Sequence, residues 1–160
     1  MVLEMNDFKC VIKVVLDEGA QLPTKGRSND VGYDLTVHSV ETSDRGLSSV
    51  NIFLVDFGVR IQPPSGFYCE LLPRSSLAWS GFIMPNSVGV IDPDYRGNLK
   101  MPLMFMGKVE EAKDLAQKLV GRRIAQLVLR RIQMCEFLEV KSDELTLTTR
   151  GELGFGSSGQ

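Results

Sequence analysis

The sequence predicts an all-β domain, built as a sandwich, a jelly roll or a barrel. Its apolar segments are short, and several alternate apolar and polar residues with a period of two, which is typical of strands buried on one face. Fifteen glycines and seven prolines are spread over the 160 residues, so turn signals separate the segments. The apolar share of 43% is that of a folded domain. We find no linker or repeat that would divide this domain.

The clearest strand signal lies in residues 52–61. Asp56 belongs to its polar face, and alternate residues on the other face are expected in the core: Phe53, Val55, Phe57, Val59 and Ile61. The same reasoning predicts further strands at Cys10–Leu16, Phe67–Leu72, Leu99–Met106, Ile124–Ile132 and Glu136–Val140.

Two segments differ from this pattern. Residues 109–120 have the composition and apolar spacing of a short helix, although Leu115, Gln117 and Leu119 also fit an alternating strand. Residues 148–160 are polar and rich in glycine, which is typical of a mobile arm rather than a core. We therefore expect a β domain over residues 1–147 and a flexible C-terminal arm over 148–160.

Composition excludes several classes of function. The net charge of −2 excludes a protein whose main work is to grip nucleic-acid backbone, but not a local basic site for a small anion. No apolar run is long enough to span a bilayer, and residues 1–9 do not resemble a secretory signal. Three scattered cysteines indicate a reducing intracellular compartment, the cytoplasm or the nucleus. His38 is the only histidine, which disfavours Cys-His and Ser-His-Asp hydrolases and multi-histidine metal sites.

Three segments have residues suited to chemistry. In residues 89–97 (GVIDPDYRG), Asp92 is a candidate base that could activate a water beside the ring of Tyr95. In residues 73–77 (PRSSL), one arginine and two serines could bind phosphate. In residues 150–159 (RGELGFGSSG), closely spaced glycines could approach phosphate, and an isolated phenylalanine could stack on a base. The first two also have purely structural interpretations, as a turn and as a helix N-cap.

Together with residues 31–37 (VGYDLTV) and 121–127 (GRRIAQL), these segments resemble the five motifs of the trimeric dUTPase family, in the family's order. The resemblance runs from about residue 30 to residue 159. It implies a distorted β jelly-roll barrel, assembled as a homotrimer with active sites between subunits and a C-terminal arm that closes a neighbour's site. The family has a strand at residues 109–120, and we expect that strand here in place of the helix.

The resemblance also implies a reaction, the hydrolysis of dUTP to dUMP and pyrophosphate. This would limit uracil in DNA and supply dUMP for thymidylate synthesis. Asp92 matches the carboxylate that activates the water attacking the α-phosphorus, and Tyr95 matches the ring that packs under the deoxyribose and excludes a 2′-hydroxyl. Asp34 matches the residue that holds Mg²⁺ through water, an arrangement that suits an ion which keeps its waters. No direct nucleic-acid or membrane partner is expected.

The remaining family positions would bind the substrate. Arg74, Ser75, Ser76 and Gln126 match triphosphate contacts, and residues 82–90 match a hairpin that reads uracil and excludes the 5-methyl group of thymine. The hairpin contacts would be made near Asn86, Gly89 and Ile91. In the arm, the matching positions are Arg150, Phe155, Gly156, Ser157 and Ser158, with Phe155 covering the uracil ring.

The sequence departs from the family pattern at four positions. Ser76 and Leu153 stand where glycine is usual, Arg122 stands where aspartate is usual, and Val31 replaces an alanine. None of these changes touches Asp92, so we expect activity, with altered affinity for the substrate.

Two other interpretations stay open at this point. The dCTP deaminases share the fold and a similar Arg-Ser-Ser segment, but residues 82–91 lack the glutamate that deamination requires. A module of the same fold that senses a nucleotide or binds a protein, without catalysis, would tolerate a departure such as Arg122.

Overall fold

The structure, a computed structural model, describes residues 10–42 and 52–153. Its strands form three sheets: a two-stranded sheet ordered β1-β5, a four-stranded sheet ordered β2-β10-β6-β8, and a four-stranded sheet ordered β3-β4-β9-β7. The pairings between neighbouring strands are antiparallel. The elements are β1 (Lys13–Leu16), β2 (Tyr33–Thr36), β3 (Ser39–Thr42), β4 (Ile52–Asp56), β5 (Val59–Gln62), β6 (Phe67–Pro73), the 3₁₀ helix η1 (Ser75–Trp79), β7 (Phe82–Ile83), β8 (Gly89–Ile91), β9 (Lys100–Phe105), α1 (Val109–Gln117), β10 (Arg123–Arg131) and the 3₁₀ helix η2 (Ser142–Glu144).

A single apolar core joins the two four-stranded sheets. Leu35, Leu71 and Leu127 of one sheet and Val55 and Met101 of the other belong to the same buried cluster. The expected all-β class is therefore confirmed, with one α-helix added to it.

The segment 52–61 is buried as expected but is not one strand. Its predicted core residues are each at most 3% exposed: Phe53, Val55, Phe57, Val59 and Ile61. The chain turns at Gly58, whose φ of +64° favours glycine, so β4 pairs with β3 and β9 whereas β5 pairs with β1. Asp56 was placed on the polar face, yet it is only 7% exposed, because its Oδ1 accepts a 2.7 Å hydrogen bond from Gly58 N at this turn.

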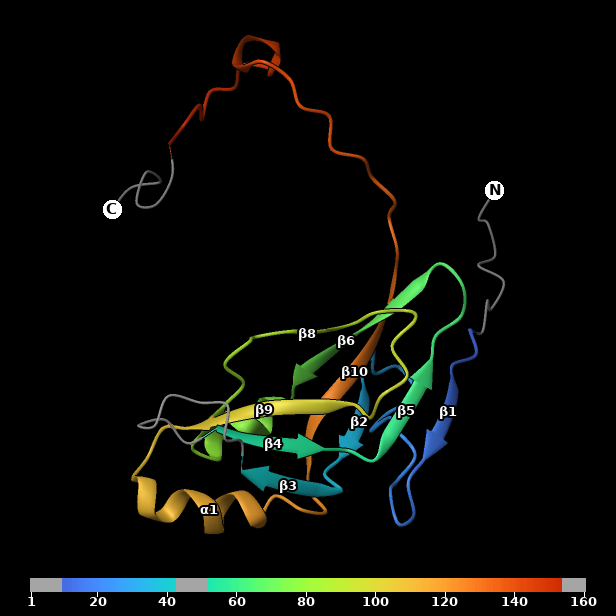
Figure 1. Cartoon of the computed structure of the whole chain (residues 1–160), viewed down its shortest axis with the longest axis vertical. Helices are drawn as coiled ribbons and strands as arrows, with labels where there is room; N and C mark the ends of the chain where they lie inside the picture. The colour runs from blue at the N-terminus through green and yellow to red at the C-terminus, as the bar shows by residue number, and fades with distance from the viewer. Residues whose placement is uncertain (1–9, 43–51, 154–160) are drawn as a thin grey trace.

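The strand expected at residues 109–120 is wrong, because the chain forms α1 there. Ala112, Ala116 and Leu119 are buried at helical spacing, and α1 lies beside β3 in Figure 1. Gln117 Nε2 also donates a 3.1 Å hydrogen bond to Val40 O of β3. The helical periodicity of these residues was therefore the better guide.

The strand expected at Glu136–Val140 is absent from this chain. The bonding of β10 to the rest of the fold ends near Ile132, whose N–H donates to Gly66 O. Beyond that point the chain rises away from the sheets as an extended segment, seen in orange in Figure 1. The other predicted strands correspond to β1, β6, β9 and β10, although Cys10–Ile12 lies outside β1.

Candidate active site

The sheet order β2-β10-β6 brings three of the motifs together. Gln126 of β10 lies opposite Asp34 of β2 on one side and Leu72 of β6 on the other. Arg74 follows directly after β6, so its side chain begins beside the same two strands. This register, and not proximity in sequence, places Asp34, Arg74 and Gln126 at one site.

Asp34 ties two arginines together at this site. Its Oδ1 lies 2.9 Å from Arg74 Nε, and its Oδ2 lies 3.3 Å from Arg123 Nη1. Arg74 Nη1 also donates a 3.0 Å hydrogen bond to Arg123 O. The carboxylate is nearly buried, with 10% of its side chain exposed, whereas the two arginines are 32% and 49% exposed. The arrangement fixes two guanidinium groups while leaving them accessible from solvent.

Asp34 and Arg74 line an open cavity of about 290 Å³ that we call the arginine cleft, whereas Arg123 is not among its lining residues. Ser75 lies at the start of η1, where the first backbone N–H groups have no partner within the helix. Ser76 is exposed but does not line the cleft. The lining residues are Gly26, Asp30, Val31, Gly32, Asp34, Arg74, Ser75 and Gln126. Arginines, a serine and free N–H groups are the donors that phosphate oxygens require.

Gln126 lines the cleft, and the backbone at Gly32 lies directly against its side chain. Its Nε2 donates a 3.3 Å hydrogen bond to Pro73 O. A Cβ on Gly32 would lie 3.0 Å from Gln126 Cδ, so a side chain at position 32 would displace the glutamine.

Asp92 and Tyr95 lie at the opposite end of β6. Ile91 of β8 pairs with Cys69, so Asp92 follows beside Tyr68. From Tyr68 to Arg74 the chain runs the length of β6, which at roughly 3.3 Å per residue is about 20 Å. Asp92 lines a different cavity of about 510 Å³ with Tyr68, Val90, Pro93, Arg131, Ile132 and Gln133. A single chain therefore does not bring the candidate base to the arginine cleft.

A polar cluster lies on β6 and β10 next to this second cavity. Glu70 accepts a 2.8 Å hydrogen bond from Arg130 Nε and a 2.9 Å hydrogen bond from the Tyr68 hydroxyl. These contacts, that of Arg130 first, hold the pKa of Glu70 below its ordinary value. The hydrogen bond to Glu70 raises the pKa of Tyr68 above its ordinary value, and the nearby charge of Arg130 opposes this.

Residues 82–90 are not the expected hairpin. β7 pairs with β9 in one sheet and β8 pairs with β6 in the other, so the segment crosses between sheets. Asn86 is exposed in the connecting turn, where Ser87 has a φ of +59°. Gly89 lies opposite Leu71 and Ile91 is 9% exposed. Residues 85–88 are exposed, although the N–H groups of Ser87 and Val88 donate within the turn, to Met84 O and Asn86 O.

The C-terminal segment separates the last motif from the rest. Residues 133–153 are exposed, and their described hydrogen bonds join residues within that segment. Arg150 Nε donates to Leu153 O at 3.0 Å. Four candidate binding residues lie outside the described residues: Phe155, Gly156, Ser157 and Ser158.

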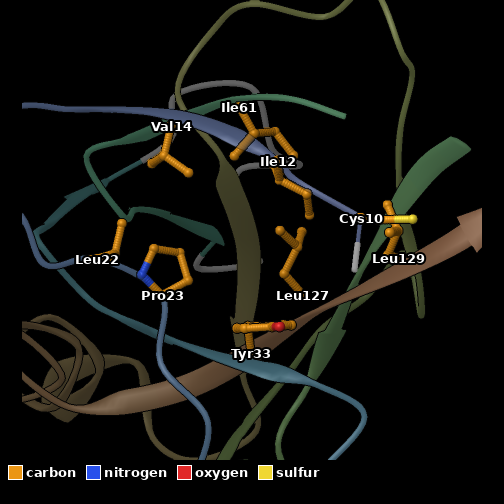
Figure 2. Close-up of a pocket in the computed structure, with 9 residues that line it drawn as sticks. All are labelled: Cys10, Ile12, Val14, Leu22, Pro23, Tyr33, Ile61, Leu127 and Leu129. Atoms are coloured by element: carbon orange, nitrogen blue, oxygen red, sulfur yellow. The ribbon is translucent and has the colours of Figure 1, made fainter. Parts of the chain in front are cut away.

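Figure 2 shows another cavity, an apolar groove of about 220 Å³ between β1 and the edge formed by β2 and β10. The side chains of Ile12, Ile61 and Leu127 point toward one another there, and Tyr33 closes one side. The lining residues are Cys10, Ile12, Val14, Leu22, Pro23, Tyr33, Ile61, Leu127 and Leu129. None of them is charged, so the groove does not suit a triphosphate.

Comparison with known proteins decides the family. The dUTPase family matches residues 18–159. The chain belongs to the dUTPase family. The predicted family is thereby confirmed.

Relatives and solved structures of the dUTPase family cover most of the chain. The deoxyuridine 5′-triphosphate nucleotidohydrolase of Fusobacterium nucleatum is 36% identical over 153 residues, which are 95% of this chain and 99% of that protein. The enzyme of the same name from Corynebacterium jeikeium is 37% identical over 162 residues, covering 99% of both chains. The dUTPase of Staphylococcus bacteriophage 80alpha, solved with dUpNHpp, has a TM-score of 0.72 at 25% identity, over 94% of this chain and 99% of that one.

Within this dUTPase-family fold, the structure locates Arg122, one of the four departures from the family motifs. It also adds two residues, Arg123 and Asp30, that the motifs did not indicate. Arg122 is exposed, and its carbonyl accepts the backbone N–H of Val37, whereas the neighbouring Arg123 is the residue that reaches Asp34. Asp30 also lines the arginine cleft, where its Oδ2 accepts a 2.8 Å hydrogen bond from Arg27 N. The repeated arginine in GRRIAQL was the signal for Arg123, but the sequence alone does not show which of the two reaches Asp34.

The described residues include no group of three or more His, Cys, Asp or Glu side chains placed to hold a metal ion. Asp30 and Asp34 are the two carboxylates among the residues that line the arginine cleft. This donor set fits a hydrated Mg²⁺ whose direct ligands come largely from substrate phosphates, and it does not fit a cage made by the protein alone. Among the described helices, none is long and apolar enough to cross a membrane.

Proposed function

We propose that this chain hydrolyses dUTP to dUMP and pyrophosphate. The observation that carries the proposal is the arginine cleft, where three motifs of the dUTPase family converge on Asp34 and the two arginines that it pairs with. The names of the relatives from Fusobacterium nucleatum and Corynebacterium jeikeium, both deoxyuridine 5′-triphosphate nucleotidohydrolases, support it. The dUpNHpp in the phage 80alpha structure supports the same class of ligand.

The arginine cleft binds the triphosphate in this proposal. Arg74 and Ser75 donate to phosphate oxygens, Gln126 adds a donor from β10, and Ser76 of η1, outside the cleft wall of the free protein, adds a hydroxyl. Asp34 holds Arg74 in place, so that less conformational freedom is lost when a phosphate binds. The uracil ring is read by main-chain groups near Asn86, Gly89 and Ile91.

Asp92 acts as the base. It takes a proton from a water molecule, the water oxygen forms a bond to the α-phosphorus, and the bond from the α-phosphorus to the bridging oxygen breaks, so that pyrophosphate leaves with that bonding pair. Tyr95 lies against the deoxyribose, where its ring leaves no room for a 2′-hydroxyl. In the arm, Phe155 covers the base while Arg150, Gly156, Ser157 and Ser158 reach the terminal phosphates.

Asp34 and Asp30 are the carboxylates that would hold a hydrated Mg²⁺ beside the triphosphate, through its waters. A structural Mg(II) ion is named for a dUTPase of phage phi11, which shares the fold. Bound beside the triphosphate in this chain, the ion would neutralise phosphate charge and align the α-phosphorus for attack. Because Asp34 already bonds two arginines, its contact with a hydrated ion would be shared with them.

The active site is shared between subunits of a homotrimer in this proposal. The separation of about 20 Å between Asp92 and Arg74 along β6 supports it, because one substrate cannot contact both residues of the same chain. The C-terminal segment supports it too, since Phe137, Leu138 and Leu147 are each at least 85% exposed in the single chain. Apolar side chains held in water in this way are normally covered by a partner, and the apolar groove of Figure 2 is one surface of matching chemistry on a neighbouring copy.

Pyrophosphate release tests the reaction. We expect the wild-type protein with Mg²⁺ to release pyrophosphate from dUTP, with little release from UTP, dTTP or dCTP. Asp92→Asn keeps the size of the side chain but removes the base, and we expect the rate to fall by a factor on the order of 10²–10⁴ while dUpNHpp still binds. Hydrolysis that survives this change would show that Asp92 is not the base.

Mixing two inactive variants tests the shared site. Asp92→Asn and Arg74→Ala subunits, unfolded and refolded together in equal amounts, would assemble at random. About a quarter of the sites would then combine an intact Asp92 with an intact Arg74, and restore about a quarter of the wild-type rate. The control replaces the second variant with the double variant, which supplies no intact Asp92. Equal activity in the two mixtures would refute a site built from different subunits.

A further inference from the structure

The ring of Tyr95 is folded back onto the chain that follows it. The Tyr95 hydroxyl donates a 2.9 Å hydrogen bond to Asn98 O, and Tyr95 N donates a 3.1 Å hydrogen bond to Asp92 O. Tyr95 is 43% exposed, so part of its surface is accessible to a ligand. Its position is therefore set by the backbone of residues 92–98.

Gly97 makes this position possible. A Cβ on Gly97 would lie 2.7 Å from Tyr95 Cζ, well inside the distance at which two carbons can pack. Because Gly97 has no Cβ, the ring can lie directly against the main chain. Any larger residue at position 97 would push the ring outward.

The side chain of Asn98 fixes the carbonyl that holds the ring. Its Nδ2 donates to Asp17 Oδ2 at 2.6 Å and to Asp56 Oδ1 at 3.2 Å. Asp17 precedes Gly19 in the turn after β1, and Asp56 ends β4, so the amide joins residues 92–98 to two parts of the fold that are distant in sequence.

Each of the two carboxylates also pairs with a cation. Asp56 is 7% exposed, and Lys100 Nζ lies 3.1 Å from its Oδ2. Burial alone raises the pKa of Asp56, but hydrogen bonds from Gly58 N, Lys100 and Asn98 outweigh it and lower the pKa below its ordinary value. Arg60 Nη2 lies 3.1 Å from Asp17 Oδ1. Asn98 therefore donates to two charged acceptors, which makes strong and well-directed hydrogen bonds.

We infer that Asn98 is a positioning residue for Tyr95, and that through it Asp17 and Asp56 set the preference for a 2′-deoxy sugar. This rests on the proposed function, in which the Tyr95 ring lies against the deoxyribose. When the Tyr95 ring is held in one position, the space between the ring and C2′ of the sugar has a fixed size. A ring free to move outward or sideways leaves room for a hydroxyl there.

Asn98→Ala tests the inference because it removes the amide but keeps the carbonyl that accepts from Tyr95. We expect the ratio of kcat/KM for dUTP to that for UTP to fall about tenfold, mainly through faster hydrolysis of UTP. Lys100→Met is the matched control. It removes a cation from Asp56 and should lower stability without changing that ratio, because the bonds of Asn98 remain.

A spectroscopic measurement separates ring position from activity. The chain has three tyrosines, so labelling with 3-fluorotyrosine gives three ¹⁹F signals, and Tyr95→Phe identifies that of Tyr95. We expect this signal to move toward that of free fluorotyrosine in Asn98→Ala but not in Lys100→Met. Gly97→Ala leaves Asn98 in place and should move the signal in the same way, which keeps the test available if Asn98→Ala does not fold.

The two measurements give distinct outcomes. An unchanged signal and an unchanged ratio in a folded Asn98→Ala protein would overturn the inference, and so would equal changes in Lys100→Met. A wild-type protein that does not hydrolyse dUTP would refute the proposed function and the link to sugar preference. The ¹⁹F signal would still show whether Asn98 holds the ring.

Discussion

Replacing Asp34 with asparagine removes one negative charge from beneath two arginines and keeps the volume of the side chain. The pair with Arg74 is 2.9 Å long and its carboxylate is 10% exposed, so it is stronger than a surface pair, which is worth about 0–1 kcal/mol. The arginines are 32% and 49% exposed, so the loss is smaller than the roughly 3–5 kcal/mol of a broken buried pair. We expect a loss of about 2 kcal/mol, which lies in the range of hydrogen bonds to charged groups.

Thermal unfolding at fixed protein concentration measures this loss. A cost of about 2 kcal/mol corresponds to a decrease in Tm of about 4–8 °C for a domain of this size. Arg74 would also lose its fixed position, and we expect the KM for dUTP to rise about tenfold, or about 1.4 kcal/mol. A change in the Mg²⁺ concentration that gives the half-maximal rate would separately report the water-mediated role of Asp34.

Glu70→Gln is the matched control, because it also removes a carboxylate from an arginine pair on the same sheet. The Glu70–Arg130 pair is 2.8 Å long, but its arginine is 53% exposed, and neither residue lines the arginine cleft or the cavity of Asp92. We expect it to cost less than about 1 kcal/mol and to leave the KM unchanged. Equal Tm values for the two variants, with an unchanged KM in Asp34→Asn, would refute the assigned role of Asp34.

Two further predictions concern buried titratable groups. Burial raises the pKa of the Cys69 thiol to about 11, so at pH 8 a disulfide reagent should reach Cys69 only after denaturation; rapid reaction of Cys69 in the folded protein would contradict this. The folded-state pKa of Asp56 lies below its ordinary value of 3.8, so its contribution to stability is complete above about pH 3.8 and is lost as the pH falls through the lower folded-state pKa. Below pH 4 the Tm of the wild-type protein should therefore fall more steeply than that of Asp56→Asn, and parallel curves would show that the charge of Asp56 does not stabilise the fold.

The strands were predictable where burial on one face imposes a period of two. Phe53 to Ile61 alternate correctly even across the turn at Gly58, because both halves face the same core. The turn itself depends on Gly58 adopting a positive φ and donating to Asp56, and nothing in the alternation marks that position. The pairing of β4 and β5 with different partners is likewise a long-range property.

For residues 109–120 the sequence pattern was correct and the family resemblance was misleading. The apolar spacing indicates a helix, but the resemblance implied a strand, and the strand was predicted. In the structure, Ala112 and Ala116 are small enough for the helix axis to approach β3 closely, and Gln117 bonds to that strand. Glu136–Val140 has strand-forming residues but pairs with no strand among the described residues, and a strand requires a partner for its backbone groups.

The candidate site was predictable in its parts but not in its arrangement. The motifs identified Asp34, Arg74 and Gln126, which the register of β2, β10 and β6 brings together. The motifs did not reveal that Asp92 lies at the far end of β6, because chain order carries no distance. Arg123 was missed because the register of β10 shifts between Arg123 and Ala125, and such an irregularity changes the direction of a side chain.

The position of the exposed C-terminal segment has a consequence for how the protein is made. The sheets are complete by Arg131, whereas residues 133–153 follow them in the sequence and bond only among themselves in the described contacts. On the ribosome, the body can therefore fold while this tail is still inside the exit tunnel. In the homotrimer proposed above this segment supplies contacts between subunits, so a stop codon just after Ile132 would leave a folded body that does not assemble.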